Sequence, residues 1–211
     1  MGTILRVNQM HPAREVLDEA VALLSFGGVL VMPTDSVYGI GCAATPNNPA
    51  HQRIFQIKQR PLSQTLPWLV ADVEDLERFS AHLSMDALKL AVAFWPGALT
   101  LVVKASDEVP PEYRGADGTI ALRLPNSALV RELARRVGVP LATTSANTHG
   151  EAAATSGFGL DARLVEQADL TLDAGPAPIA LASTIVSCVG PEPVILREEA
   201  ISRSQIHSVL R

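Results

Sequence analysis

The hydrophobic residues of this chain form two kinds of pattern, separated by proline, glycine and polar residues. Short continuous apolar runs are typical of buried strands, and apolar positions at helical spacing are typical of amphipathic helices. The first pair is a strand over 3–7 and a helix over 12–25, which Pro12 suits at its start and Gly27 at its end. Further strands are predicted over 29–32, 66–70, 99–104, 119–124, 141–144, 170–173, 184–189 and 194–196, and further helices over 49–60, 73–79, 85–94, 127–137 and 160–167.

Strands and helices alternate irregularly, and strands dominate the later part of the chain. This order predicts an α/β fold with a mixed, twisted sheet, and not a strict series of strand–helix–strand units. No internal repeat and no linker divides the chain, so residues 1–211 are expected to form a single domain. Residues 105–118 and 148–158 are expected to be loops, the second of them mobile because it is rich in Gly, Ala and Thr.

The polar stretch after the strand at 29–32 is the first candidate for function. It reads P-T-D-S-V-Y-G-I-G, and Pro33 ends the strand because proline lacks an amide donor. Gly39 and Gly41 are expected to permit a positive φ and a close approach of the backbone. An ordinary strand-to-loop exit capped by Thr and Asp is one interpretation. The other is that the polar side chains of the loop face a substrate, these being Thr34, Asp35, Ser36 and Tyr38.

The composition bounds the class of protein. Hydrophobic residues make up 47% and charged residues 18% of the chain, as in globular proteins. No apolar run reaches the length of a membrane span, and the N-terminus lacks the pattern of a signal peptide. Cys42 and Cys188 form no zinc-type spacing, which favours two free thiols in a reducing cytoplasm. The net charge of −5 argues against a protein that coats nucleic acid, but it leaves room for a local basic cleft.

Two familiar motifs are excluded. Gly39, Gly41 and Ala44 match the spacing of a dinucleotide fingerprint, but that motif must open a helix, and T-P-N-N-P follows here. The five histidines are scattered, and none lies at ligand spacing from another histidine or a cysteine. A zinc enzyme is therefore not expected.

Two cations lie close together at the end of the helix at 49–60, in the sequence Lys58-Gln59-Arg60-Pro61. One interpretation is a favourable interaction with the negative end of the helix dipole. The other is an anion clamp. Because the chain must change direction at Pro61, both cationic heads could converge on a phosphate or a carboxylate.

A second polar motif, T-T-S-A-N at 143–147, follows directly from a buried strand. Its hydroxyls, side-chain amide and turn amides could form an anion-binding nest. Alternatively, it is a local turn of the kind that Ser, Thr and Asn favour through bonds to their own backbone.

Two arginines lie on predicted strands. Arg123 occupies a strand whose opposite face is apolar, so its charge requires a partner or a ligand. Ser183 begins a late strand, and Arg197 closes the last one. Arg197 could simply pair with Glu198 or Glu199.

Taken together and in order, these motifs resemble the YrdC-type family of threonylcarbamoyl-AMP synthases. The resemblance is carried by P-T-D-S-V-Y-G-I-G, K-Q-R-P, W-P-G-A-L-T-L-V, R-L-P-N, T-S-A-N, S-T-I-V and V-I-L-R. It implies a YrdC-like twisted open mixed sheet with flanking helices and a concave, positively lined cavity. It also implies a nucleotidyltransferase that makes L-threonylcarbamoyladenylate and pyrophosphate from L-threonine, bicarbonate and ATP, the first step toward the t6A modification of adenosine 37 in tRNA.

The resemblance also implies a role for individual positions. The ATP-binding set comprises Lys58, Arg60, Ser145, Asn147 and Arg197. The threonine-binding set comprises Thr34, Tyr38, Arg123, Thr143 and Ser183. No catalytic side chain is assigned, and Mg²⁺ is expected to arrive with ATP, held mainly by phosphates and water and not by protein side chains. The implied partners are proteins that transfer the threonylcarbamoyl group to tRNA, with tRNA or double-stranded RNA as a further candidate and no membrane.

Two positions depart from the family pattern. Gln64-Thr65-Leu66 stands where many relatives carry a basic residue and then Pro-Leu, and Ser187 stands where Asp is common. The chain is expected to be the short, single-domain form. One alternative is a YrdC-like enzyme that adenylates a different carbamoyl donor. The other is an RNA-binding or ribosome-maturation module without turnover, against which the acidic net charge and the aromatic content of 4% argue.

Overall fold

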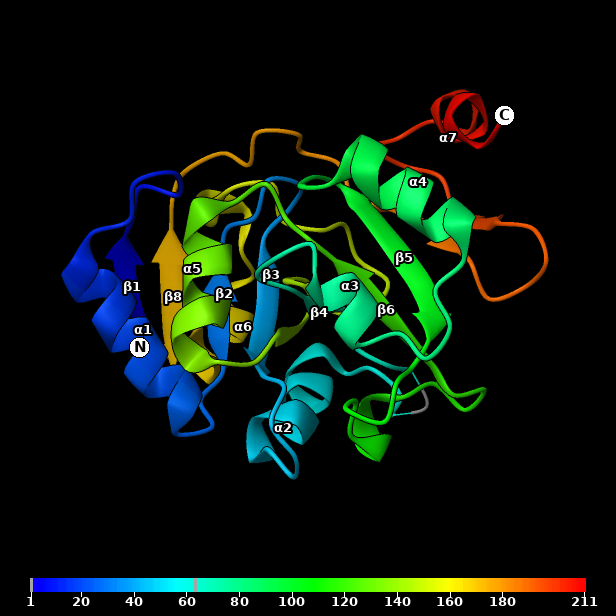
Figure 1. The fold of residues 1–211 in the computed structure, drawn as a ribbon. Helices are drawn as coiled ribbons and strands as arrows, with labels where there is room; N and C mark the ends of the chain where they lie inside the picture. Colours follow the sequence, from blue (N-terminus) through cyan, green and yellow to red (C-terminus); the bar gives the residue numbers. More distant parts are fainter. Residues whose placement is uncertain (1, 63) are drawn as a thin grey trace.

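The computed structural model describes residues 2–62 and 64–211, and one mixed β-sheet runs through it (Figure 1). The strands lie side by side in the order β1-β8-β2-β3-β7-β4-β6-β5-β9-β10. Parallel pairs such as β5 with β9 and antiparallel pairs such as β3 with β7 both occur, which confirms the mixed sheet predicted from sequence. The strands are β1 (Thr3–Arg6), β2 (Leu30–Met32), β3 (Gly39–Ala43), β4 (Trp68–Leu69), β5 (Leu99–Lys104), β6 (Thr119–Arg123), β7 (Leu141–Ser145), β8 (Leu170–Asp173), β9 (Thr184–Ser187) and β10 (Val194–Arg197).

Helices flank the sheet, and every predicted helix is found, although α1, α2 and α6 are each two residues shorter than predicted and α3 is three residues shorter. The sequence analysis missed α7, whose signal lies in Ser202 and Gln205. Each of these side chains caps a backbone amide of the other residue, in a capping box. The described part of the chain contains α1 (Arg14–Ser25), α2 (Pro49–Lys58), α3 (Asp75–Arg78), α4 (Met85–Phe94), α5 (Ala128–Val137), α6 (Ala162–Gln167) and α7 (Arg203–Leu210), with 3-10 turns at Pro111–Tyr113 and Gly157–Gly159.

The helix boundaries follow from local capping groups. The Ser127 side chain accepts a hydrogen bond from the Val130 amide and begins α5, and Gly138 ends the helix with a φ of 81°. Asn48 begins α2 in the same way, because its side chain accepts from the Ala50 amide. These caps explain why the predicted helix starts, at residues 49 and 127, agree closely with the structure.

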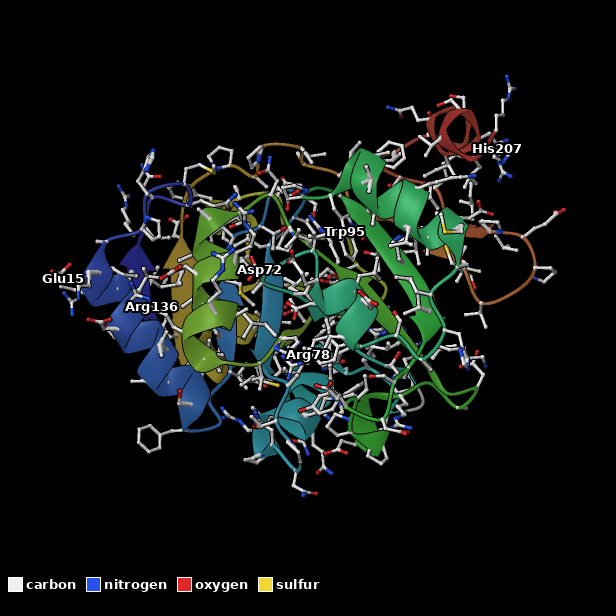
Figure 2. The ribbon with its side chains drawn as sticks, in the orientation of Figure 1. Glu15, Asp72, Arg78, Trp95, Arg136 and His207 are labelled. Carbon is white, nitrogen blue, oxygen red and sulfur yellow. The ribbon has the colours of Figure 1, made fainter. Side chains whose placement is uncertain are left out.

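The sheet is covered on both faces because successive side chains of a strand point in opposite directions. Leu30 and Met32 of β2 pack into an apolar cluster with residues of α1 and α5, whereas Val31 packs into a second cluster with residues of α2 and β3. Figure 1 shows α1 and α5 side by side across β8 and β2. Arg136 of α5 reaches α1 through an ion pair with Asp18 at 2.8 Å (Figure 2).

The stretch from Gly39 onward is a strand and not a loop, which corrects one prediction. Gly39 and Gly41 belong to β3, which pairs antiparallel with both β2 and β7. Neither glycine has a positive φ. A side chain at Gly39 would meet Thr143 Cγ2 at 2.7 Å, and one at Gly41 would meet Thr143 Oγ1 at 2.5 Å. The two glycines are therefore needed for close packing against the neighbouring strand, and the polar loop is reduced to residues 33–38.

Both cysteines are free and buried, as predicted. Burial raises the pKa of the Cys42 thiol and of the Cys188 thiol to about 12, because a thiolate is poorly stabilised away from water. Across residues 2–62 and 64–211, no helix is both long and apolar enough to cross a membrane. The single-domain prediction includes Met1 and Ser63, which lie outside the described residues.

Candidate functional site

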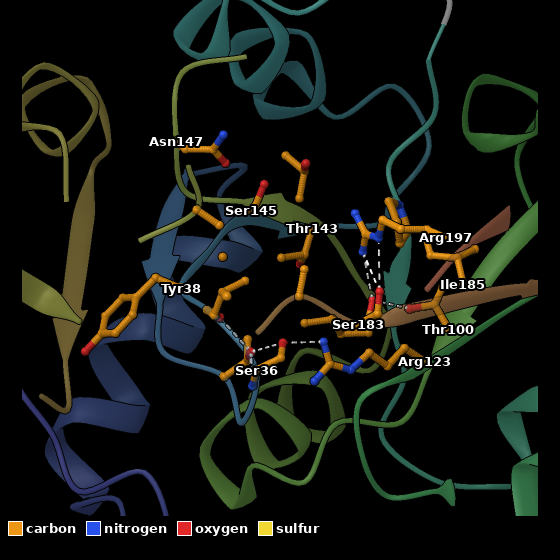
Figure 3. Close-up of a pocket in the computed structure, with 18 of the residues that line it drawn as sticks. Ser36, Tyr38, Thr100, Arg123, Thr143, Ser145, Asn147, Ser183, Ile185 and Arg197 are labelled. Atoms are coloured by element: carbon orange, nitrogen blue, oxygen red, sulfur yellow. Dashed lines mark hydrogen bonds between the residues drawn. The ribbon is translucent and has the colours of Figure 1, made fainter. Parts of the chain in front are cut away.

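A cavity of about 300 Å³ opens on the sheet face that α1 and α5 cover elsewhere (Figure 3). Ala43 and Leu141 are paired across β3 and β7 and pack into the cluster with these helices. The next pairs on that face are Gly41 with Thr143 and Gly39 with Ser145, because side chains of a strand alternate between the two faces. Gly39, Thr143 and Ser145 line the cavity, and Gly41 packs beside it. The lining residues are Thr34, Ser36, Val37, Tyr38, Gly39, Arg60, Pro67, Leu69, Thr100, Arg123, Thr143, Thr144, Ser145, Asn147, Glu151, Ala153, Ala182, Ser183, Ile185 and Arg197.

The charged residues of this lining are three arginines and one glutamate: Arg60, Arg123, Arg197 and Glu151. The concave, positively lined cavity implied by the family resemblance is therefore present. A pocket in which cations outnumber carboxylates, surrounded by hydroxyl groups, is suited to anionic groups such as phosphates and carboxylates.

The loop between β2 and β3 forms one wall of the cavity. The Thr34 hydroxyl donates to the Val37 carbonyl oxygen at 2.7 Å, and the Ser36 amide donates to Thr34 Oγ1 at 3.1 Å. This is a local hydroxyl-stabilised turn, as the structural interpretation of the loop predicted. The turn nevertheless turns its polar groups toward the cavity, because both Thr34 and Ser36 belong to the lining. The two interpretations of this loop are thus compatible.

Arg123 has a partner within the protein. Its guanidinium forms a buried ion pair with Asp35, donates to Ser36 Oγ at 2.7 Å and donates to the Gly97 carbonyl oxygen at 2.9 Å. Burial lowers the pKa of Arg123, which Asp35 opposes, and the side chain of Asp35 is only 4% exposed. Each guanidinium nitrogen thus contacts a protein oxygen, so Arg123 holds the loop at 33–38 against the end of β6.

Arg197 reaches the cavity because β10 contains a bulge. Ile195 pairs with Val186, but Arg197 and not Leu196 pairs with Ile185, which lines the cavity. In a regular antiparallel pair Leu196 would lie opposite Ile185, and Arg197 would point to the other face. The extra residue is therefore what places a cation in the site.

Arg197 does not pair with a glutamate in the described part of the chain. Its Nη2 and Nε donate to the Ser183 carbonyl oxygen at 2.7 and 3.1 Å. The Ser183 hydroxyl lies 2.8 Å from the hydroxyl of Thr100, and Figure 3 shows this group at one end of the cavity. Burial lowers the pKa of Arg197, opposed by Glu199.

Arg60 enters the cavity lining from another element, just beyond the end of α2. The helix stops because Gln59 adopts a left-handed conformation with a φ of 54°. Beyond this reversal, Arg60 lines the cavity, donates to Thr144 Oγ1 at 2.8 Å and donates to the Thr65 carbonyl oxygen at 3.0 Å. Among residues 2–62 and 64–211, its buried Nε atom has no hydrogen-bond partner. A guanidinium has five N–H groups, so Arg60 keeps donors that these bonds do not use.

Lys58 is not among the lining residues, so the prediction that Lys58 and Arg60 converge on one anion does not match this structure. Lys58 is 2% exposed, and its ammonium points to the backbone of the turn after β7. Burial, with a contribution from Arg60, lowers its pKa to about 8.

Tyr38 lines the cavity, but its hydroxyl points away from it (Figure 3). The hydroxyl lies 3.0 Å from Asp173 Oδ1 and 2.7 Å from the Gly175 carbonyl oxygen, and it accepts from the Ala174 amide. Burial raises its pKa to about 12. The hydroxyl therefore anchors the segment after β8, and the assignment of Tyr38 to the threonine-binding set stays a prediction.

The remaining predicted residues occupy the end of β7 and the turn after it. Thr143 and Ser145 lie opposite Gly41 and Gly39, and Asn147 follows in the turn. The structure therefore brings nine of the ten predicted positions to one cavity, all except Lys58. Their individual roles as ligands stay predictions.

Several lining residues were not in the predicted sets. Thr144 and Ser36 lie inside motifs that the sequence analysis noted, so their place within those motifs could have identified them as lining residues. Thr100 and Ile185 belong to strands read only as apolar runs, and nothing in their local sequence marks them. Within residues 2–62 and 64–211, no group of three or more His, Cys, Asp or Glu side chains is arranged to hold a metal ion.

Comparison with known proteins identifies the family. The Sua5/YciO/YrdC family model, described as telomere recombination, matches residues 22–199. The threonylcarbamoyl-AMP synthase of Bacillus subtilis (strain 168) is 35% identical to this chain over 197 residues, an alignment that covers 91% of this chain and 56% of that protein. A putative threonylcarbamoyl-AMP synthase of Mycobacterium leprae is 38% identical over 191 residues, covering 90% and 86% of the two chains.

A solved structure agrees with these relatives. The crystal structure of Pyrococcus abyssi Sua5 complexed with L-threonine superposes with a TM-score of 0.89 at 30% sequence identity, covering 98% of this chain and 60% of that chain. This chain thus spans 56% of the B. subtilis protein and 60% of the P. abyssi chain. The family model matches most of the chain, and a relative of comparable length shares over a third of its residues. The protein therefore belongs to the Sua5/YciO/YrdC family.

Proposed function

We propose that this protein is an L-threonylcarbamoyladenylate synthase, a nucleotidyltransferase that uses L-threonine, bicarbonate and ATP and releases pyrophosphate. One observation carries the proposal: nine of the ten positions assigned from the family resemblance line a single cavity with three arginines and one glutamate. The names of the relatives support the same activity, as does the complex of P. abyssi Sua5 with L-threonine.

The reaction brings anions together, so it calls for cations and oriented donors more than for a nucleophilic side chain. The threonine amine takes up the carbon of bicarbonate with loss of water and becomes an N-carboxylate. An oxygen of that carboxylate attacks the α-phosphorus of ATP, the bond from the α-phosphorus to the bridging oxygen breaks, and pyrophosphate leaves. In this proposal the protein binds, orients and balances charge.

Two sets of residues divide this work within the one cavity, and they meet where Arg197 donates to Ser183. Arg60, Ser145, Asn147 and Arg197 form the nucleotide side, where guanidinium groups balance phosphate charge. The hydroxyls of Thr34, Thr143 and Ser183, together with Arg123, form the threonine side. Arg123 is already held by Asp35 and Ser36, so it offers a fixed cation that needs little rearrangement when substrate binds.

Magnesium is proposed to enter as part of the ATP substrate. The cavity lining offers hydroxyls, one side-chain amide and the single carboxylate of Glu151, which is a poor set for a metal cage built by the protein alone. An ion that keeps its phosphate and water ligands fits this donor set. Mg²⁺ would supply charge neutralisation on the triphosphate.

The product is a reactive mixed anhydride, so proteins that transfer its threonylcarbamoyl group to tRNA are the proposed partners. A cytoplasmic location is part of the same proposal. It fits two free, buried cysteines and a pathway that ends on tRNA. Direct contact of this chain with tRNA or double-stranded RNA is a separate, weaker proposal, since the net charge is −5.

The first test is pyrophosphate release by the purified chain, followed with and without each substrate. Release is expected only when L-threonine, bicarbonate and ATP are all present, with threonylcarbamoyl-AMP detected by mass spectrometry. Arg60→Ala is expected to lower kcat/KM by about 100-fold or more, because it removes a cation from the nucleotide side. The matched control is Arg78→Ala, which removes a half-exposed arginine paired with Glu108 on the surface.

The same assay separates the alternatives. Pyrophosphate release that needs carbamoyl phosphate and not threonine would point to a different carbamoyl donor. RNA binding that weakens with salt, without any turnover, would point to a binding module. Release that is independent of both threonine and bicarbonate would overturn the proposed function.

A further inference from the structure

The ammonium of Lys58 is enclosed by oxygen atoms of one turn. Lys58 Nζ lies 2.5 Å from the Ser145 carbonyl oxygen, 2.6 Å from the Asn147 carbonyl oxygen and 3.2 Å from Asn147 Oδ1. A lysine ammonium has three N–H donors and no acceptor. All three donors therefore have a protein acceptor, and none remains for a phosphate oxygen unless one of these bonds breaks.

Arg60 provides the contrast within the same motif. It lines the cavity, and within the described part of the chain Nη1 and Nη2 each donate to a single protein oxygen, while Nε has no partner there. A guanidinium carries five N–H donors, so Arg60 can still meet an anion. The reversal at Gln59 sends the two side chains to different places.

The turn that Lys58 holds carries two groups of the proposed nucleotide side. Asn147 uses Oδ1 to accept from Lys58, and its Nδ2 donates to the carbonyl oxygens of Thr148 at 2.9 Å and Glu151 at 2.8 Å. The His149 amide donates back to the Lys58 carbonyl oxygen at 2.9 Å. The cation thus sits at the centre of a network that sets the backbone from Ser145 to Glu151.

We propose that Lys58 is a positioning residue, which shapes the turn at 145–151 from behind and acts on the nucleotide through that turn, while Arg60 meets the phosphates directly. This assignment rests on the proposed function for its kinetic consequence. The hydrogen bonds on which the assignment rests are those of the ligand-free protein, and they do not depend on the proposed function. The low solvent exposure of Lys58 agrees with it, since a buried ammonium must be fully hydrogen-bonded.

The test begins with hydrogen exchange of the ligand-free protein. Lys58→Met removes the ammonium and keeps an unbranched side chain that is one atom shorter. We expect amides in 145–151 to exchange about tenfold faster or more than in the native chain, because the turn loses its central donor. The control is Lys104→Met, which removes another ammonium bonded to a carbonyl oxygen, that of Asp117, outside the cavity lining. It should leave exchange in 145–151 unchanged.

Nucleotide binding supplies the second readout. A positioning residue should lower the affinity for ATP and for AMP by similar factors, within about threefold of each other, because it acts on the shared site. Loss of ATP affinity with AMP affinity retained, and with native exchange in 145–151, would identify Lys58 as a direct ligand of the outer phosphates and overturn the proposal. The native chain's threonine-dependent pyrophosphate release is scored separately, so a failed function and a failed positioning role are distinguished.

A second variant covers the case in which Lys58→Met does not fold. Asn147→Ala removes one of the three acceptors together with the amide that reaches Glu151, and it should also speed exchange in 145–151. If both variants fold, the double variant should exchange no faster than Lys58→Met alone, because both act on one network. Additive effects of the two substitutions on exchange would contradict a shared network.

Discussion

The cations of the site fall into two groups that differ in what their donors contact. Lys58 and Arg123 are 2% and 5% exposed, and every nitrogen of each cationic group meets a protein oxygen. Arg60 and Arg197 are more accessible and keep donor groups that no hydrogen bond within the described residues uses. The donors of the first group hold the walls of the cavity in place, although Arg123 also lines it, and the second group keeps donors for a ligand.

This difference teaches that a basic motif does not by itself identify a ligand. Lys58 and Arg60 are two residues apart, and the same helix end presents them. The Lys58 ammonium nevertheless donates all its hydrogen bonds to carbonyl oxygens, whereas Arg60 faces the cavity. Substitutions in the first group should therefore act mainly on stability and local order, and substitutions in the second mainly on turnover.

The largest stability effect is expected at Asp35, which balances the charge of Arg123. Asp35→Asn leaves the buried guanidinium without an opposite charge, which typically costs about 3–5 kcal/mol. Urea unfolding followed by circular dichroism would measure it. The matched control is Glu108→Gln, which breaks the half-exposed pair with Arg78 and should cost about 1 kcal/mol or less. Equal costs for the two substitutions would remove the distinction between wall-forming and surface cations.

A smaller effect is expected at Tyr38. Tyr38→Phe removes the hydroxyl bonded to the segment after β8 and should lower the free energy of unfolding by about 1 kcal/mol. Turnover should fall by less than about tenfold, since the hydroxyl faces away from the cavity. Tyr113→Phe is the control, because its buried hydroxyl donates to Thr45 outside the lining. A loss of turnover above about 100-fold with native stability would support the assignment of Tyr38 to the threonine-binding set.

The smallest effect is expected at His51, which lies outside the site. Its substitution tests whether a group outside the cavity contributes to the pH dependence of the free energy of unfolding. Burial lowers the pKa of His51, and Glu112 opposes the shift. The ring packs edge-on against Phe55 and tilted against Tyr113. The unfolded chain then takes up a proton more readily than the folded one, so stability should fall as pH drops below about 6.5. His51→Gln should flatten this fall between about pH 7 and pH 5. His82→Gln, at an exposed position, should leave the fall as it is.

The sequence determined most of the elements and the identity of the site's residues. Caps such as Ser127 and Gly138 fix helix ends through local hydrogen bonds, and apolar runs mark the strands, so the boundaries could be read without tertiary information. The order of the motifs pointed to nine residues that the fold brings to one cavity. The last helix was not predicted, although the capping box of Ser202 and Gln205 is a local signal for it.

Only the tertiary structure decided where each side chain points. A strand pattern cannot reveal that a bulge turns Arg197 and not Leu196 toward Ile185. It cannot reveal that Gly39 and Gly41 make room for Thr143, or that Asp35 neutralises Arg123 from 88 residues away. Nor does it reveal that the turn at 145–147 surrounds Lys58. These facts depend on pairing between distant segments, and local sequence carries no record of the partner. The types of residue in the site could therefore be predicted from the sequence. Long-range contacts decided which of them hold the cavity walls in place and which keep donors for a ligand.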